Sequence, residues 1–225
     1  MITRYFGLPG AGKTSLACKL SIDEVKRISL GISKYQYVFT NFDVKHPFVF
    51  KVENDMIGKY NFQNCLLIID EAYAFAGARN WKGYSAELME YMNTHRHYVT
   101  DVDRYRNDIV IISQGANAID SSLRQITEKC CYIRKSKLNP NKTKIIELIL
   151  TPIIPVKKGI MNEQGSGDVA EDIPIGYQMP GILGQLRSPS FDRRPYYQYF
   201  DTCERKKLPD VPGEVFIKSI KSASE

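Results

Sequence analysis

The eight residues from 7 to 14 read GLPGAGKT, and they constrain the fold of this chain more than any other stretch. Their spacing, G-x-x-x-x-G-K-[ST], is that of the phosphate-binding loop, or Walker A motif. A short apolar run at residues 2–6 predicts a strand before the loop. Over residues 13–30, apolar positions recur at helical spacing and predict a helix after the loop. A glycine turn that arises by chance lacks this context, so the pattern predicts a nucleotide-binding loop between a strand and a helix.

Each residue type in the loop has a physical role in binding a phosphate chain. Glycines let the main chain turn tightly enough for its N–H groups to point at phosphate oxygens, and the N-terminus of the next helix adds partial positive charge. Lys13 would reach the β- and γ-phosphates, and the Thr14 hydroxyl would ligate Mg²⁺. The predicted cofactors are therefore ATP and Mg²⁺. The predicted nucleotide-binding residues are Gly7, Leu8, Pro9, Gly10, Ala11, Gly12, Lys13, Thr14 and Ser15.

An acidic pair, Asp70 and Glu71, follows a continuous apolar run at residues 65–69. Such a run suits a parallel strand that is buried on both faces. A carboxylate at the end of that strand, beside the loop, can hold Mg²⁺, which predicts Asp70 as a metal ligand together with Thr14. Glu71 could polarise the attacking water, an arrangement typical of NTP-hydrolysing motors rather than of small-molecule kinases. The alternative is two carboxylates in an ordinary strand-end loop.

Gln114 ends another strand that we expect to be buried, at residues 108–114. Ligands bind at the carboxyl ends of strands in open α/β sheets. The Gln114 amide can hydrogen-bond the γ-phosphate or the water there. The alternative is a polar residue at a strand end without such a role. Arg124, in a helix expected at 121–128, is the candidate for a catalytic arginine supplied in trans. The rivals of Arg124 are Arg79, Arg104, Arg106 and Arg134, and for each of these arginines, Arg124 included, the alternative is a solvated surface charge.

Strands that alternate with helices predict an α/β fold with a mostly parallel sheet covered by helices on both faces. The expected fold class is the P-loop NTPase, with its core at residues 1–151. Residues 152–225 are expected to form an irregular, β-rich extension packed on the core, with a flexible loop at about 159–190. The other expected elements are strands at 35–41, 48–52, 130–134, 144–150 and 195–200, and a helix at 84–97.

Composition narrows the remaining function classes. The net charge of +6 permits an anionic partner without demanding one. A basic run from Lys129 to Lys144 could track nucleic-acid phosphates or could block pairing at a sheet edge. The five cysteines lack zinc-like spacing and indicate buried thiols in a reducing compartment. Because no secretory signal and no run approaching 18 apolar residues is present, we expect a soluble, cytoplasmic chain.

Further motifs give the chain a family resemblance. His95-Arg96-His97 closes the predicted helix at 84–97, where cations are favoured near a helix C-terminus. The alternative for Arg96 is a role near the phosphates. The strand that ends in Gln114 follows. Residues 119–124 read IDSSLR, and residues 199–202 read YFDT. Together with the loop and the acidic pair, these stretches resemble the zonula occludens toxin (Zot) family, whose ATPase domain is shared with filamentous-phage assembly proteins. The resemblance spans roughly residues 1–205, although the polar stretch between His97 and Asp108 is longer than the family's connection.

The resemblance implies a cytoplasmic ATPase with a motor core of the FtsK/HerA type, working at the inner membrane in the assembly and export of filamentous phage or prophage. The partners it implies are further copies of the chain in a ring, phage DNA, and capsid or assembly proteins. The family continues into a transmembrane helix and an extracytoplasmic tail, to which its toxin-like activity is assigned. We therefore expect membrane association only through parts that this sequence does not contain, and we do not carry the toxin-like activity over to this chain.

Two other functions stay open on the residues alone. The first is a P-loop kinase for a nucleotide or another small molecule, although no compact arginine-rich lid motif is visible. The second is a nucleotide-gated interaction module with little turnover.

Overall fold

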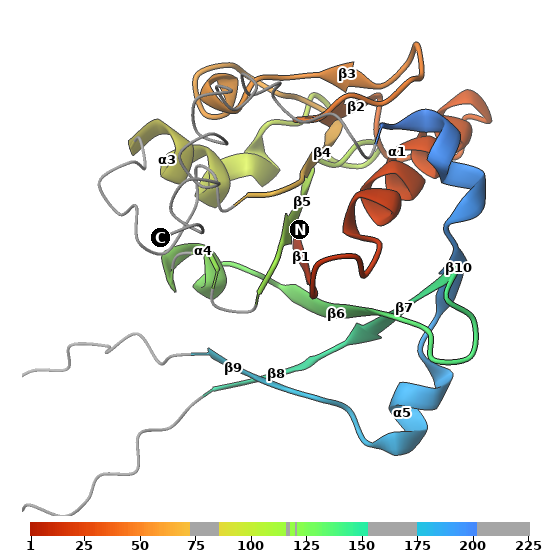
Figure 1. Cartoon of the computed structure of the whole chain (residues 1–225). Helices are drawn as coiled ribbons and strands as arrows, with labels where there is room; N and C mark the ends of the chain where they lie inside the picture. The colour runs from red at the N-terminus through yellow and green to blue at the C-terminus, as the bar shows by residue number, and fades with distance from the viewer. Residues whose placement is uncertain (73–85, 116–117, 120, 153–174, 202–225) are drawn as a thin grey trace, which may run out of the picture.

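The computed structural model describes residues 1–72, 86–115, 118–119, 121–152 and 175–201. Within these ranges an eight-stranded sheet has the order β10-β7-β6-β1-β5-β4-β2-β3, and a separate two-stranded sheet pairs β8 with β9 (Figure 1). The strands of the large sheet are β1 (Ile2–Phe6), β2 (Tyr37–Thr40), β3 (Phe50–Lys51), β4 (Cys65–Ile69), β5 (Asp108–Ser113), β6 (Lys129–Lys135), β7 (Lys142–Glu147) and β10 (Ser190–Asp192). The small sheet consists of β8 (Ile149–Pro152) and β9 (Ile175–Gln178).

The sheet is mostly parallel, as the sequence predicts. All neighbouring strands are parallel in the part of the sheet with the order β6-β1-β5-β4-β2-β3. Strand β7 runs antiparallel to both of its neighbours, β6 and β10. The register brings Phe6, the last residue of β1, opposite Ser113 of β5 and Tyr132 of β6. The carboxyl ends of β1, β4 and β5 therefore meet at one edge of the sheet, and that edge carries the predicted motifs.

Helices cover both faces of this sheet (Figure 1). Along β4, Leu66 and Ile68 pack in a core cluster with α1, while Leu67 and Ile69 pack in a second cluster with α3 and α4. Every residue of β4 is buried, which is why its sequence is continuously apolar instead of alternating. Each such fully buried side chain contributes about 1.5–3 kcal/mol through the hydrophobic effect. The α-helices are α1 (Lys13–Ser29), α3 (Ala86–Thr94), α4 (Ser121–Gln125) and α5 (Ile182–Arg187).

Short 3₁₀ helices complete the described elements: η1 (Asn54–Met56), η3 (His95–His97) and η4 (Arg194–Tyr199). The helix expected at 84–97 thus consists of α3 followed by η3, and the helix expected at 121–128 ends at Gln125. None of the helices in the described ranges has both the length and the apolar character needed to span a bilayer.

The single strand expected at residues 144–150 is wrong, because two strands, β7 and β8, occupy this stretch. The pairing of β7 with β6 reaches Glu147 opposite Cys131, and Leu148 then donates from its main-chain N to the Cys130 carbonyl at 2.8 Å. Since β6 begins at Lys129, only that one residue of β6 precedes Cys130, and the chain after Leu148 has almost no β6 residues to pair with. It continues as β8 and pairs with β9 instead.

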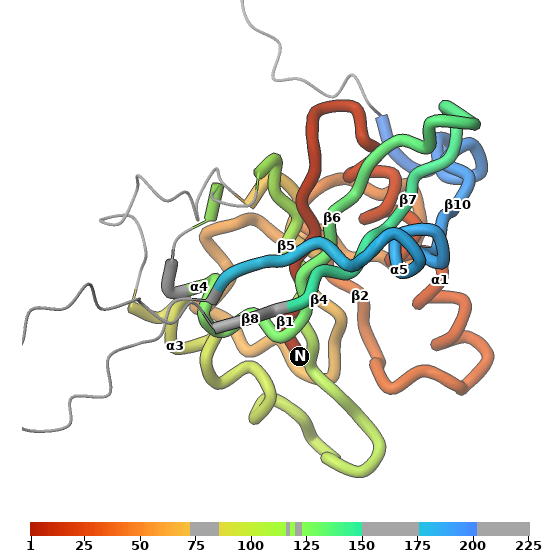
Figure 2. Tube along the Cα trace, turned by 90° about the horizontal axis from the view of Figure 1, so that it is seen from below, coloured from red at the N-terminus to blue at the C-terminus, as the bar shows by residue number. Residues whose placement is uncertain are grey.

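The two-stranded sheet of β8 and β9 lies beneath the main sheet, as the view from below shows (Figure 2). Arg4 of β1, which is fully buried, donates from Nη1 to the Tyr177 hydroxyl of β9 at 3.2 Å and lies over the Tyr177 ring. The predicted domain boundary between residues 151 and 152 falls inside β8. Parts of the C-terminal extension therefore pack on the core directly.

Two further expectations for the C-terminal extension are corrected. The part of the expected flexible loop from 175 to 190 contains β9 and α5 and reaches the start of β10, while residues 159–174 lie outside the described ranges. The aromatic strand expected at 195–200 is the 3₁₀ helix η4. Pro195 stands in the first turn of η4, where its fixed φ and missing N–H are tolerated, whereas a central strand would need that N–H for its ladder.

Candidate functional site

The loop that joins β1 to α1 needs its glycines for two reasons. Gly10 and Gly12 have φ angles of 73° and 93°, in the left-handed region that favours glycine. The space around Gly12 is also closed, because a Cβ there would lie 2.4 Å from Thr143 Oγ1 and 2.6 Å from Arg193 Cδ. A Cβ on Gly7 would meet the Ile133 carbonyl oxygen at 2.3 Å. The loop is therefore fixed both by its own conformation and by its neighbours on β6 and β7.

Lys13, the first residue of α1, folds its side chain back over the loop. Its Nζ donates to the carbonyl oxygens of Gly7 at 2.9 Å and Leu8 at 3.2 Å. Burial lowers the pKa of Lys13, while the nearby carboxylates of Asp70 and Glu71 act in the opposite direction. Phosphate oxygens are stronger acceptors for an ammonium than these carbonyls are, so a phosphate chain in the loop would compete for Lys13.

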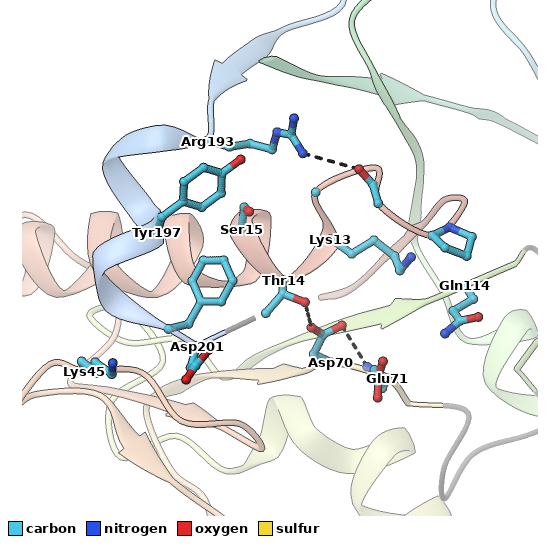
Figure 3. A pocket seen from close by; sticks show the side chains of 14 residues that line it. Lys13, Thr14, Ser15, Lys45, Asp70, Glu71, Gln114, Arg193, Tyr197 and Asp201 are labelled. Atoms are coloured by element: carbon cyan, nitrogen blue, oxygen red, sulfur yellow. Dashed lines mark hydrogen bonds between the residues drawn. The ribbon is translucent and has the colours of Figure 1, made fainter. Parts of the chain in front are cut away.

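Thr14 and Asp70 meet at the sheet edge, as the sequence predicts. The Thr14 hydroxyl donates to Asp70 Oδ2 at 2.8 Å, and the main-chain N of Glu71 donates to Asp70 Oδ1 at 2.9 Å (Figure 3). Asp70 is only 6% exposed, and this burial raises the pKa of its carboxyl above 3.8, although both hydrogen bonds act to lower it. A hydroxyl and a carboxylate are oxygen donors of the kind that Mg²⁺ prefers. The two residues therefore fit a Mg²⁺ ion that also takes oxygens from phosphate and water.

Asn41, directly after β2, fixes the main chain of Asp70. Its Oδ1 accepts from Asp70 N at 2.7 Å, and its Nδ2 donates to the Asp70 carbonyl at 2.9 Å and to Asn54 Oδ1 at 3.0 Å. Asn41 was not among the predicted site residues. The rule that found Asp70 and Gln114, a polar residue at the carboxyl end of a parallel strand, would have found it too.

Glu71 and Gln114 both line the cleft around the loop. Glu71 is exposed and has a φ of 51°, a left-handed conformation that is uncommon for a residue other than glycine. Such a conformation costs about 1–3 kcal/mol and persists only where the surroundings hold it. Here the next residue, Ala72, donates from its main-chain N to the Ile112 carbonyl of β5 at 3.1 Å. The strained turn directs the chain at the end of β4 so that Glu71 lies on the cleft side, close to Lys13 and Gln114 (Figure 3).

The cleft has a volume of about 910 Å³ and is built from five parts of the chain: the loop with the start of α1, the ends of β4 and β5, the segment after β2, and the residues that follow β10. This size is within the range of small-molecule and cofactor sites. The lining residues are Pro9, Gly10, Gly12, Lys13, Thr14, Ser15, Lys45, Asp70, Glu71, Gln114, Arg193, Tyr197, Phe200 and Asp201.

Two residues distant in the sequence hold the loop from its outer side. Thr143 of β7 donates from Oγ1 to the Ala11 carbonyl at 2.8 Å. Arg193, which is nearly buried, donates from Nη1 to the Gly10 carbonyl at 3.4 Å, from Nε to the Asn141 carbonyl at 3.2 Å, and from Nη2 to the Pro140 carbonyl. No local pattern marks either residue, because each lies more than a hundred residues from the loop. They were found only in the folded chain.

The arginines considered for the reaction lie elsewhere. Arg124 of α4 is not among the described residues that line the cleft, and its charge acts on Tyr177 of β9, so its role in trans stays a prediction. Arg96 forms an ion pair with Glu128 and lines a separate cavity of about 400 Å³. Arg79 lies outside the described residues. The three others, none of them among the cleft-lining residues, are Arg104, Arg106 and Arg134.

A family model described as Zonular occludens toxin (Zot) matches residues 41–139. Among solved structures, the N-terminal domain of zonular occludens toxin from Neisseria meningitidis is similar in fold. The match covers 89% of this chain and 98% of that one, with 19% identity and a TM-score of 0.53. The resemblance to the Zot family is confirmed. The Zot match begins at Asn41 and includes Asp70, Glu71, Gln114 and Arg124, whereas the loop at 7–14 precedes it.

Two other solved structures match over a smaller share of the chain. The genome packaging NTPase B204 from Sulfolobus turreted icosahedral virus 2, in complex with ATP-gammaS, covers 65% of this chain and 91% of its own, with 13% identity and a TM-score of 0.44. The flagellar accessory protein FlaH from Methanocaldococcus jannaschii covers 65% of this chain and 76% of its own, with 9% identity and a TM-score of 0.41. A search of curated protein sequences finds no match.

Proposed function

We propose that this chain is a Mg²⁺-dependent ATPase of the motor type that works in the assembly and export of filamentous phage or prophage. The observation that carries the enzymatic part is the 2.8 Å hydrogen bond from Thr14 to Asp70, in a cleft that also contains Lys13, Glu71 and Gln114. The Zot family match supports the phage part.

Each residue has a defined task in this proposal. Lys13 and main-chain N–H groups of the loop at residues 7–14, where only Pro9 lacks one, bind the phosphates, and Thr14 and Asp70 would hold Mg²⁺. When bound, the ion neutralises charge on the phosphate oxygens. Glu71 orients the attacking water and accepts a proton from it, and the Gln114 amide donates to the γ-phosphate or to the water.

Hydrolysis is favoured over transfer to another acceptor by the position of Glu71. Its carboxylate follows directly after the metal-binding Asp70 and lies on the cleft side with Gln114 (Figure 3). A carboxylate at that position can orient a water molecule and accept its proton, and no second substrate is needed. A kinase needs a further pocket for its acceptor beside the terminal phosphate.

The proposal includes the partners that the family resemblance implies. Copies of the chain form a ring, in which Arg124 of one copy reaches the nucleotide of the next. The cargo is phage DNA or capsid and assembly proteins. The ring works in the cytoplasm, at the inner face of the membrane.

The enzymatic part is tested by measuring ATP hydrolysis with Mg²⁺ and with excess EDTA, for the wild type and for Lys13→Ala. We expect turnover by the wild type with Mg²⁺ only and loss of both binding and turnover in Lys13→Ala. ADP formation that depends strictly on an added acceptor would indicate a kinase instead. Tight ATP binding without hydrolysis, even with DNA and lipid present, would indicate a nucleotide-gated module.

A further inference from the structure

The wall of the cleft beside α1 is made by residues that follow β10. Phe200, which is only 5% exposed, packs against Cys18 and Ile22 of α1. On its other side the same segment meets the loop after β2, where the Lys45 main-chain N donates to the Tyr199 carbonyl at 2.6 Å. The His46 and Tyr199 rings also contact each other, with 6.3 Å between their centroids. The wall is therefore fixed to two other parts of the core.

The two ends of the cleft differ in chemistry. Glu71 and Gln114 lie at one end, next to Lys13, and their roles in hydrolysis mark it as the end for the terminal phosphate (Figure 3). Ser15, in the first turn of α1, lies toward the other end, on the same side as Tyr197 (Figure 3). A triphosphate with its terminal phosphate at Glu71 therefore points its nucleoside toward Tyr197.

Tyr197 offers an aromatic ring at this nucleoside end. It lines the cleft and is 43% exposed, so part of its side chain is accessible to a ligand. Phe200 contacts the ring edge to face, with centroids 6.2 Å apart and an interplanar angle of 70°. Because Phe200 is itself held in the core, this contact limits how far the Tyr197 ring can turn. A held, accessible aromatic face is what stacking of a nucleobase requires.

We propose that Tyr197 stacks on the nucleobase, and that η4 and the loop after β2 form the base-binding part of the cleft. This inference rests on the proposed function, since it takes the orientation of the triphosphate from Glu71 and Gln114. The ligand class is a purine nucleoside triphosphate. Stacking accepts any base but is stronger for the larger purine face, so ATP and GTP bind with similar affinity and CTP and UTP bind less tightly.

The test separates the base from the phosphates by comparing a non-hydrolysable ATP analogue with inorganic tripolyphosphate, both with Mg²⁺, in isothermal titration calorimetry. Tyr197→Ala should weaken binding of the ATP analogue by about 5- to 150-fold, the range that corresponds to loss of one base–aromatic stack, and should leave tripolyphosphate binding unchanged. Tyr197→Phe keeps the ring and should bind the analogue like the wild type. Tyr60→Ala is the matched control, because Tyr60 is 59% exposed and does not line the cleft.

Three results are distinguishable. The base-binding role of Tyr197 is wrong if Tyr197→Ala binds the ATP analogue with wild-type affinity. It is also wrong if the variant loses as much affinity for tripolyphosphate as it loses for the ATP analogue. If the wild type binds the analogue through Tyr197 but never hydrolyses ATP, the proposed function is wrong and the base site stands. If Lys13→Ala binds tripolyphosphate as well as the wild type does, the phosphate site on which both proposals depend is wrong. Thermal unfolding of each variant verifies that it is folded.

Discussion

The side-chain amide of Asn41 holds the main chain of Asp70 by two hydrogen bonds, one from Asp70 N at 2.7 Å and one to the Asp70 carbonyl at 2.9 Å. The two residues follow β2 and β4, which are neighbours in the sheet. The pair of bonds fixes the point at which the chain leaves β4. It thereby sets the position of the Asp70 carboxylate beside Thr14 and the strained turn at Glu71.

Asn41→Ala should therefore impair catalysis as well as stability. The change leaves two main-chain groups of a buried residue without their partner, which should lower the free energy of unfolding by about 1–3 kcal/mol. The released chain should misplace Asp70 and Glu71, so kcat should fall at saturating ATP even at temperatures where the variant is folded. Urea unfolding and steady-state ATP hydrolysis measure the two effects.

Asn54→Ala is the control for Asn41→Ala, since it removes the 3.0 Å bond to the Asn41 side chain but leaves both bonds to Asp70 available. Its effect on kcat should be smaller. If Asn41→Ala lowers stability and yet keeps the wild-type kcat, Asn41 has no part in positioning the site.

The buried carboxylate of Asp70 should make the ligand-free protein less stable at neutral pH. Burial raises its folded pKa above 3.8, so the folded state favours the protonated form. Its contribution to stability is present below pH 3.8 and is lost as the pH rises through the raised folded pKa. Asp70→Asn, which keeps a neutral hydrogen-bonding side chain, should thus melt at the same or a higher temperature than the wild type at pH 7, and should not hydrolyse ATP.

Melting temperatures from pH 4 to pH 8, without Mg²⁺ or nucleotide, measure this difference. The gap between Asp70→Asn and the wild type should widen as the pH rises through the raised pKa. Asp103→Asn, a change at an exposed position, controls for the loss of one negative charge. A melting temperature for Asp70→Asn well below that of the wild type at pH 7 would show that the carboxylate stabilises the ligand-free fold.

Arg193 should be required for the shape of the phosphate-binding loop. Its guanidinium donates to carbonyls of Gly10, Pro140 and Asn141, a fork of bonds that a lysine ammonium cannot reproduce from one position. Arg193→Lys, which keeps the charge, and Arg193→Ala should both weaken tripolyphosphate binding. Calorimetry measures the effect. Arg194→Ala is the control, because Arg194 is exposed and pairs with Asp192. Equal tripolyphosphate affinity for wild type and Arg193→Lys would show that only the charge of Arg193 matters.

The sequence predicted the parts of this site that local patterns encode. The loop at 7–14, the buried strand before Asp70 and the strand before Gln114 each show in a few consecutive residues, and a parallel sheet then brings their ends together. Asn41 follows the same rule but was not assigned. No sequence pattern predicts the left-handed turn at Glu71, since glutamate has no preference for that conformation.

The C-terminal wall of the cleft could not be predicted in this way. Tyr197 and Arg193 lie more than 170 residues beyond the loop, and their neighbours in the sequence suggested a strand. The aromatic residues at 196–200 have high strand propensity, but Pro195 and the packing of Phe200 on α1 favour a 3₁₀ helix. Tertiary contacts therefore determine the conformation of this segment.

The central claim is that Glu71 serves a water molecule in Mg²⁺-dependent ATP hydrolysis, and Glu71→Gln tests it most directly. The substitution keeps the size of the side chain and the strained turn but removes the proton acceptor. Steady-state ATP hydrolysis and calorimetric binding of a non-hydrolysable ATP analogue are measured on the same samples. We predict a kcat at least about 100-fold below that of the wild type, with unchanged affinity for the analogue. Hydrolysis by Glu71→Gln at the wild-type rate would contradict the account.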